Sequence, residues 1–324
     1  MIKAFVVEQE RLRQIDDFHQ RPEEVVWLDL LSPTKDEEIA VENLLAVGVP
    51  TREEMEEIEI SSRLYVEDGN YFMTATLPAH AEGDERVMAP VTFVLANNRL
   101  ITIRYHEPRA FQTFPMRAEK VSTGCIDGET ILVGLLEAVV DRLADIIEGA
   151  GRGIDEISVN IFQSREKHAA SRDRDFKKML QQIGRKEELT SNLRDSLASL
   201  QRLSGFLGHA ASTDKSSKDV RARIKTLSRD VQSLADHLSF LQQKITFLLD
   251  ATLGMISIEQ AGIIKIFSVA AVVFLPPTLV ASNYGMNFDV MPELHWLLGY
   301  PFAIGMMFLS GLVPYLYFKR RGWL

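Results

Sequence analysis

The sequence has one cysteine, no surplus of basic residues and no apolar run at its start. Cys125 alone excludes an intrachain disulfide framework and a cysteine-based zinc cluster. The formal net charge of −9 argues against binding to nucleic acid, which requires a basic face. Residues 1–14 lack the charged-then-apolar order of a signal peptide, so any insertion into a membrane must be directed by segments further along the chain.

Catalytic and metal-binding groupings are also missing from the sequence. We find no nucleophile beside a base and no phosphate-binding loop, so we expect neither an enzyme nor a bound cofactor. The 7 histidines are scattered without the close spacing of metal ligands, which places them as surface or core residues.

Two apolar segments, residues 263–282 and 297–318, stand out instead. Each is long enough, at roughly 30 Å of helix, to cross a bilayer. Lys319, Arg320 and Arg321 follow the second segment, while the connecting residues 283–296 contain no Lys or Arg. The positive-inside rule then places the connection outside and both termini in the cytoplasm. Two buried helices of a soluble protein are the alternative, which the adjacent C-terminal placement and basic tail disfavour.

Residues 1–120 have the pattern of a small α+β domain, similar to an α/β sandwich. Strands are predicted at 4–7 and 25–30, and helices begin after Pro33 and at Thr51. Two hairpins are predicted from turn residues that tolerate positive φ, at Asp68-Gly69 and Asn97-Asn98.

Residues 121–262 have helical periodicity and form a predicted stalk of long helices. A break is expected at 208–217, and a third helix then begins near Asp219 and continues through the first apolar segment to about residue 282. Such a helix must pack on the preceding helices or on copies of itself. This pattern alone leaves two interpretations open, a coiled-coil stalk that anchors a domain and a pore.

The residues between the two apolar segments favour the pore. Gly285-Met286-Asn287 follows the first segment, and Met291-Pro292-Glu293-Leu294 comes next. With the flanking segments and the basic tail, this resembles the CorA family of magnesium channels, the enterobacterial members in particular. The resemblance is strong over about 255–324 and only architectural before it.

The resemblance implies a funnel-shaped homopentamer in the bacterial inner membrane, with a cytoplasmic domain (1–120), a stalk (121–262) and a membrane domain (263–324). Magnesium, and with it cobalt or nickel, would enter down its electrochemical gradient. No cofactor is implied, because Mg²⁺ is the substrate and a regulator. The partners are copies of the chain, lipid and divalent cations, with no nucleic acid.

Magnesium releases its water reluctantly, so a selective mouth does better to hold the hydrated ion through neutral oxygens. We assign Asn287 to this outer-sphere contact and Gly285 and Met286 to the shape of the filter. Capping of the helix end is the alternative role for Asn287. Asp289 and Glu293 would concentrate cations at the entrance.

The resemblance also implies a pore face at helical spacing along the first segment. Thr278 would offer a hydroxyl to the hydrated ion. Leu275 and Ile264 would form apolar constrictions that gate by dewetting, or pack against lipid and helices. The complete face is Asp250, Ser257, Ala261, Ile264, Ser268 or Phe267, Ala271, Leu275 and Thr278. Ala261 departs from the polar Asn common in related sequences. Lys265 is expected to snorkel toward the headgroups.

Two other functions stay open at this stage. A zinc transporter of the ZntB type uses the same scaffold, although its mouth usually lacks the methionine present here as Met286. A membrane-anchored sensor or scaffold would need no ring of Asn287. Closure by intracellular magnesium is a family property that uses acidic residues between neighbouring cytoplasmic domains. Candidates are Glu82, Asp84, Glu85, Asp230 and Asp236, although an ordinary solvated surface explains these acids equally well.

Overall fold

The computed structural model describes residues 1–18, 21–79, 87–163, 169–213, 216–287 and 292–323. The chain divides into two compact units, Met1–Leu248 and Leu249–Leu324. The sequence pattern placed boundaries near 120 and 262 instead. The first of these falls inside one unit because the following helices pack on the sheet, and Leu248 is the last buried apolar residue of its helix before Val269.

The first unit is built on a mixed seven-stranded sheet with the order β2-β1-β3-β7-β6-β5-β4. Neighbouring strands are antiparallel except β3 and β7, which run parallel. The strands are β1 (Ile2–Glu8), β2 (Arg11–Ile15), β3 (Val25–Leu31), β4 (Leu64–Glu67), β5 (Asn70–Ala79), β6 (Val87–Ala96) and β7 (Arg99–Arg104).

Both predicted hairpins are confirmed. Asp68 and Gly69 have φ of 50° and 79° between β4 and β5, and Asn97 and Asn98 have φ of 48° and 66° between β6 and β7. These paired positive φ values match the right-handed twist of the strands. The edge strand β2 was not predicted, because only Leu12 of its side chains is buried and no apolar alternation marks it.

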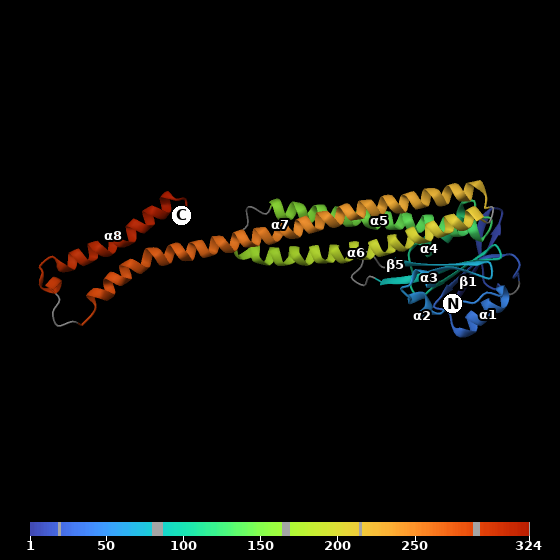
Figure 1. The fold of residues 1–324 in the computed structure, drawn as a ribbon, viewed down its shortest axis with the longest axis horizontal. Helices are drawn as coiled ribbons and strands as arrows, with labels where there is room; N and C mark the ends of the chain where they lie inside the picture. Colours follow the sequence, from blue (N-terminus) through green and yellow to red (C-terminus); the bar gives the residue numbers. More distant parts are fainter. Residues whose placement is uncertain (19–20, 80–86, 164–168, 214–215, 288–291, 324) are drawn as a thin grey trace. The chain divides into compact units, whose positions relative to one another are not determined.

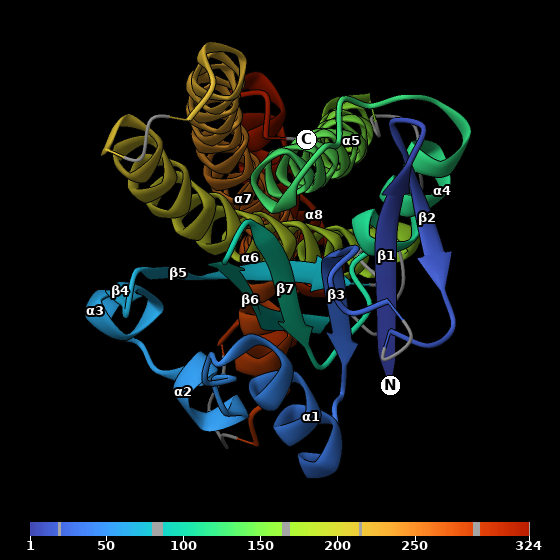
Figure 2. The ribbon, with the colours of Figure 1, turned by 90° about the vertical axis from the view of Figure 1, so that its right-hand side faces the viewer.

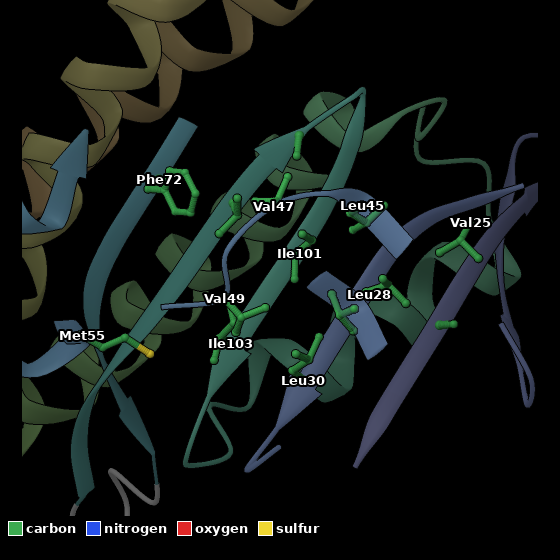
Figure 3. Close-up of a cluster of buried hydrophobic side chains, with 14 of the residues drawn as sticks. Val25, Leu28, Leu30, Leu45, Val47, Val49, Met55, Phe72, Ile101 and Ile103 are labelled. Atoms are coloured by element: carbon green, nitrogen blue, oxygen red, sulfur yellow. The ribbon is translucent and has the colours of Figure 1, made fainter. Parts of the chain in front are cut away.

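Short helices cover one face of the sheet (Figure 2). They are α1 (Lys35–Leu45), α2 (Arg52–Glu56) and α3 (Ile60–Arg63). Thr34 and Thr51 begin α1 and α2 with capping boxes, each closed by a glutamate three residues later. Leu45, Val47, Val49 and Met55 pack from this layer onto the sheet (Figure 3).

Helices also cover the opposite face of the sheet, two of them long, so the unit is a three-layer sandwich (Figure 2). They are α4 (Ala110–Lys120), α5 (Gly128–Gln163) and α6 (Ala169–Thr213). Trp27 of β3 stacks on Phe5 at 4.5 Å between ring centroids and meets Phe111 and Phe114 of α4 at 6.4 and 6.1 Å. These aromatic contacts fix α4 against the sheet.

A buried ion pair lies in this sheet, between Asp29 of β3 and Arg104 of β7. Arg104 donates to both oxygens of Asp29, at 2.9 and 2.8 Å, and both residues are 1% exposed. Thr102 donates to Asp29 at 2.8 Å, and the Trp27 indole donates to Thr102 at 3.0 Å. This network was not predicted from the sequence, because charged residues within a strand ordinarily indicate its solvent face.

The predicted break at 208–217 is partly wrong, because α6 continues to Thr213. Gly208 lies against α7, where a Cβ on it would be 3.7 Å from Ile224 Cγ2, and Ser212 donates to the carbonyl of Gly208 at 2.8 Å. Packing between helices therefore outweighs the low helix propensity of glycine here.

The second unit contains the end of α7, the 3-10 helix η1 (Pro292–His295) and α8 (Gly299–Arg320) (Figure 1). Helix α7 (Lys218–Tyr284) is one uninterrupted helix of 67 residues, which confirms the predicted continuity through residue 282. It retains Pro276 and Pro277 in its interior.

Candidate functional site

Two helices are long and apolar enough to cross a membrane, α7 and α8. They correspond to the two apolar segments of the sequence, although α7 continues to Tyr284 and α8 spans Gly299–Arg320 rather than 297–318. In the described part of the chain, the candidate site is the C-terminal part of α7, where the helix corresponds to the first apolar segment.

Helix α8 covers one side of this end of α7. A Cβ on Gly311 would lie 3.3 Å from both Pro277 Cγ and the carbonyl oxygen of Val273. That carbonyl has no helical N–H partner, because Pro277 occupies the position four residues later. Glycine thus permits a close approach of α8 to α7 at the point where α7 lacks a main-chain hydrogen bond. Val269, which is 4% exposed, is buried on the same side of α7.

The predicted pore stripe lies on the other side of α7. At 3.6 residues per turn, its mean direction is about 150° around the helix from the side that contains Lys265, Val269, Val273 and Pro277. Every residue of the stripe is exposed in the single chain: Asp250, Ser257, Ala261, Ile264, Phe267, Ser268, Ala271, Leu275 and Thr278. The structure therefore leaves this stripe uncovered by its own chain.

Thr278 has a defined hydroxyl geometry within the stripe. Its Oγ1 donates to the carbonyl of Phe274 at 2.6 Å. Because the hydroxyl proton is used in this bond, the oxygen lone pairs remain to accept a hydrogen bond from a water molecule. Leu275 and Ile264 are each 66% exposed and could meet their counterparts in other copies.

Helix α7 ends at Tyr284, six residues beyond Thr278, in a tight C-terminal turn. The N–H of Gly285 donates to Ala281 O at 3.0 Å, and that of Met286 donates to Asn283 O at 3.4 Å. Gly285 does not have a positive φ, but a Cβ there would lie 3.2 Å from Ala281 O. Glycine is needed here for close backbone approach rather than for left-handed geometry.

Asn287 follows this turn and is exposed. Among the described residues, no hydrogen bond ties its side chain to a carbonyl of α7, so the geometry does not favour the capping alternative. Its amide oxygen has no hydrogen-bond donor among the described residues and can accept hydrogen bonds. Asp289 lies outside the described residues, and Glu293 falls in η1. Their role as attractants stays a prediction.

The expected regulatory carboxylates are placed only in part. Glu82, Asp84 and Glu85 lie outside the described residues. Asp230 lines a cavity of about 650 Å³ between α4, α5 and α7, which also contains Asp141. Asp236 accepts a hydrogen bond from Gln232 at 2.8 Å. Among the described residues, no group of three or more His, Cys, Asp or Glu side chains could hold a metal.

Charges of both signs line the cavity that contains Asp230. Arg223 donates to both carboxylate oxygens of Glu137, at 2.9 and 2.7 Å, and this hydrogen bonding raises the pKa of Arg223. Burial raises the pKa of Asp141, and the nearby Arg117 lowers it. Since arginines balance the acids, the cavity does not have the uncompensated negative charge of a cation site.

A contact that was not predicted from the sequence lies at the other end of the first apolar segment. Lys265 does not simply extend toward headgroups: its Nζ donates to Gly322 O at 3.3 Å and lies 5.6 Å from the centre of the Trp323 ring. The sequence signal for this contact is Gly322-Trp323, which follows the basic residues at the end of α8.

These features describe a chain with two candidate membrane spans and a large unit built of a sheet and helices. The model of the CorA-like Mg2+ transporter protein family matches residues 22–320, and the chain belongs to that family. This confirms the resemblance read from the Gly-Met-Asn segment.

Individual relatives agree with the family assignment. The chain is 37% identical over 327 residues to a protein of Escherichia coli (strain K12) named magnesium transport protein CorA, with 100% of both chains covered. The complete CorA magnesium transporter from Methanocaldococcus jannaschii has the same fold, with a TM-score of 0.80 at 17% identity over 100% of this chain and 99% of that one. The ZntB cytoplasmic domain from Vibrio parahaemolyticus shares the fold alone, with a TM-score of 0.53 at 10% identity over 79% of this chain and 97% of that one.

Proposed function

We propose that this protein is a Mg²⁺ channel, and that Co²⁺ and Ni²⁺ are further substrates. The observation that supports this best is the uncovered stripe on α7, which faces away from α8 and leads to the exposed side chain of Asn287. A stripe of this kind requires partners, and identical helices around an axis would supply them. The relative named magnesium transport protein CorA supports the choice of ion.

Five copies would place five Asn287 amides at the outer mouth. Their oxygens would accept hydrogen bonds from the water shell of Mg²⁺, so that the ion need not lose its water there. Further in, nine residues before Asn287, the Thr278 oxygens would accept hydrogen bonds from the water shell of the passing ion, since each hydroxyl already donates to Phe274 O. Neutral oxygens at both levels would let the ion leave again.

Rings of Leu275 and Ile264 would form the apolar constrictions of this pore. Narrow apolar rings gate by excluding water. Asp250, exposed on the same face, would attract the departing cation. Both termini would be cytoplasmic in the bacterial inner membrane, because Lys319, Arg320 and Arg321 end α8. The membrane potential would then drive entry, at about 2.3 kcal/mol per charge per 100 mV.

Uptake of Mg²⁺ into liposomes tests this proposal. The Asn287→Ala variant is expected to lower Mg²⁺ uptake by about tenfold or more, because five amide oxygens are lost together and each hydrogen bond contributes about 1 kcal/mol. Asn283→Ala is the matched control. Asn283 is also exposed at the end of α7, and its carbonyl bond to Met286 is a main-chain bond that the substitution retains.

Equal uptake by Asn287→Ala and wild type would remove Asn287 from the ion path. Parallel assays with Zn²⁺ separate the zinc alternative, since a protein that moves Zn²⁺ and not Mg²⁺ would belong to that functional class. A protein that moves neither ion under a potential would be a sensor or scaffold.

A further inference from the structure

The C-terminal end of α8 forms a rigid turn. Gly322 has φ of 70°, the N–H of Trp323 donates to Phe318 O at 3.0 Å, and the N–H of Gly322 donates to Lys319 O at 3.2 Å. This is a Schellman motif with glycine at the left-handed position. Trp323 also stacks on Phe318, at 5.4 Å between ring centroids, which supplies the apolar contact typical of the motif.

The turn presents two groups to α7. The carbonyl of Gly322 accepts a hydrogen bond from Lys265 Nζ, and the Trp323 ring lies beside the same ammonium group. No ion pair joins Lys265 to an acid in the described residues, so its binding partners are this carbonyl and this ring. Lys319 differs, because its Nζ lies over Tyr315 of its own helix, 6.0 Å from the ring centre.

We propose that Lys265, Gly322 and Trp323 form an intrachain latch that positions the inner constriction of the pore. Lys265 is the neighbour of Ile264 and lies about 100° from it around α7. A contact that holds Lys265 against α8 therefore fixes the rotation of α7 at Ile264. The contact of Gly311 with Pro277 and Val273 lies further along the same pair of helices and holds the same side of α7 against α8.

Transport should respond to the loss of this latch, an expectation that rests on the proposed channel function. An apolar ring excludes water only while its side chains converge closely. Lys265→Met frees α7 to rotate and should raise the maximal Mg²⁺ flux by about threefold or more. This factor corresponds to the loss of one cation–π contact at an exposed site. The half-saturating Mg²⁺ concentration should stay unchanged, because Asn287 is at the opposite end of the span.

Variants separate the latch from the charge that it carries. Lys319→Met removes the same charge beside the same helix end without touching α7, and its flux should match wild type. Trp323→Leu should behave as Lys265→Met does, and the double variant should add nothing further. Lys265→Arg should keep the flux at the wild-type level, because a guanidinium can also donate a hydrogen bond to the Gly322 carbonyl and lie against the Trp323 ring. Gly322→Ala, strained at positive φ, is a milder second route to the same loss.

A spectroscopic readout tests the contact without transport. The chain has 3 tryptophans, so fluorotryptophan labelling of the full-length protein gives resonances of Trp27, Trp296 and Trp323. The resonance that disappears in Trp323→Leu should shift in Lys265→Met and stay in place in Lys319→Met. If it does not shift, the latch is overturned. If it shifts while the flux of Lys265→Met is no higher than that of Lys319→Met, the positioning role is overturned. Absence of Mg²⁺ flux in wild type would overturn the channel function and leave the contact intact.

Discussion

The buried pair of Asp29 and Arg104 illustrates how much one residue can decide in this fold. Arg104→Met would leave the Asp29 carboxylate buried without its cation, with only Thr102 donating to it. Loss of one partner of such a pair costs about 3–5 kcal/mol. We expect the urea midpoint of the full-length protein in detergent to fall accordingly, as measured by circular dichroism of the aromatic residues around Trp27.

The exposed pair of Arg152 and Glu148 on α5 provides the control. Their side chains meet at 2.6 Å but are 67% and 70% exposed. Solvent screening reduces such pairs to about 1 kcal/mol or less, so Arg152→Met should scarcely move the midpoint. If both variants lost the same stability, burial would not be the source of the effect.

His106 gives the fold a predictable sensitivity to acid. It is 8% exposed, its Nε2 bonds to Leu77 O at 2.9 Å, and its Nδ1 has no partner among the described residues. Burial lowers its pKa from 6.5, and the charge of Arg104 lowers it further, against the Leu77 bond. The unfolded chain therefore takes up a proton first, and stability is lost as the pH falls from about 6.5 toward the lower folded-state value.

His106→Gln should remove this dependence while its amide still donates to Leu77 O. Urea midpoints at pH 7.5, 6.5 and 5.5 would measure the difference, with the exposed His237→Gln as control. A wild-type midpoint that falls no faster with acid than that of His106→Gln would contradict this assignment.

At the scale of the element, the contact between α7 and α8 at Gly311 is the one most sensitive to the size of a side chain. Gly311→Leu would push a side chain into Pro277 and the carbonyl of Val273, where a Cβ alone would already lie at 3.3 Å. Such overpacking costs about 1–3 kcal/mol. The thermal midpoint of the purified protein should fall.

Gly305 lies in the same helix and is the matched control. A Cβ there would meet nothing within 4 Å in the described chain, so Gly305→Leu should be tolerated far better. Equal losses from both substitutions would indicate a general intolerance of bulk in α8 rather than a specific contact at Gly311.

The elements also indicate how far the sequence could be interpreted. The hairpin turns at Asp68-Gly69 and Asn97-Asn98 and the continuous helix α7 depend on local conformational preferences and on periodicity, and these were predicted. The parallel pairing of β3 with β7 depends on residues far apart in the chain, such as Trp27 beside Leu100, and no local pattern encodes it. The latch was missed for the same reason, since Lys265 and Gly322 meet only when the two helices fold back.

At the scale of the whole molecule, the candidate pore is incomplete in one chain. Residues of the stripe from Asp250 to Thr278 line one face of one helix, and a ring exists only where copies meet. The sequence could nominate Asn287 as a candidate for the mouth because its motif is linear, and that role stays a prediction. The sequence could not provide distances across an axis, because these belong to the assembly. The mass of the native assembly, expected at five times the 36.6 kDa of the chain, tests the copy number.

Disulfide crosslinking tests which face of α7 meets its copies. In a background with Cys125→Ala, which removes the buried native thiol, Ser257→Cys should form dimers that survive denaturing electrophoresis after mild oxidation. The control is Ile258→Cys, since Ile258 is 73% exposed but lies about 100° away around the helix. A thiol on the axis meets its copy within reach of a disulfide, whereas one turned away does not. Stronger crosslinking at position 258 than at 257 would place another face of α7 on the axis, and with it a different set of residues along the path of the ion.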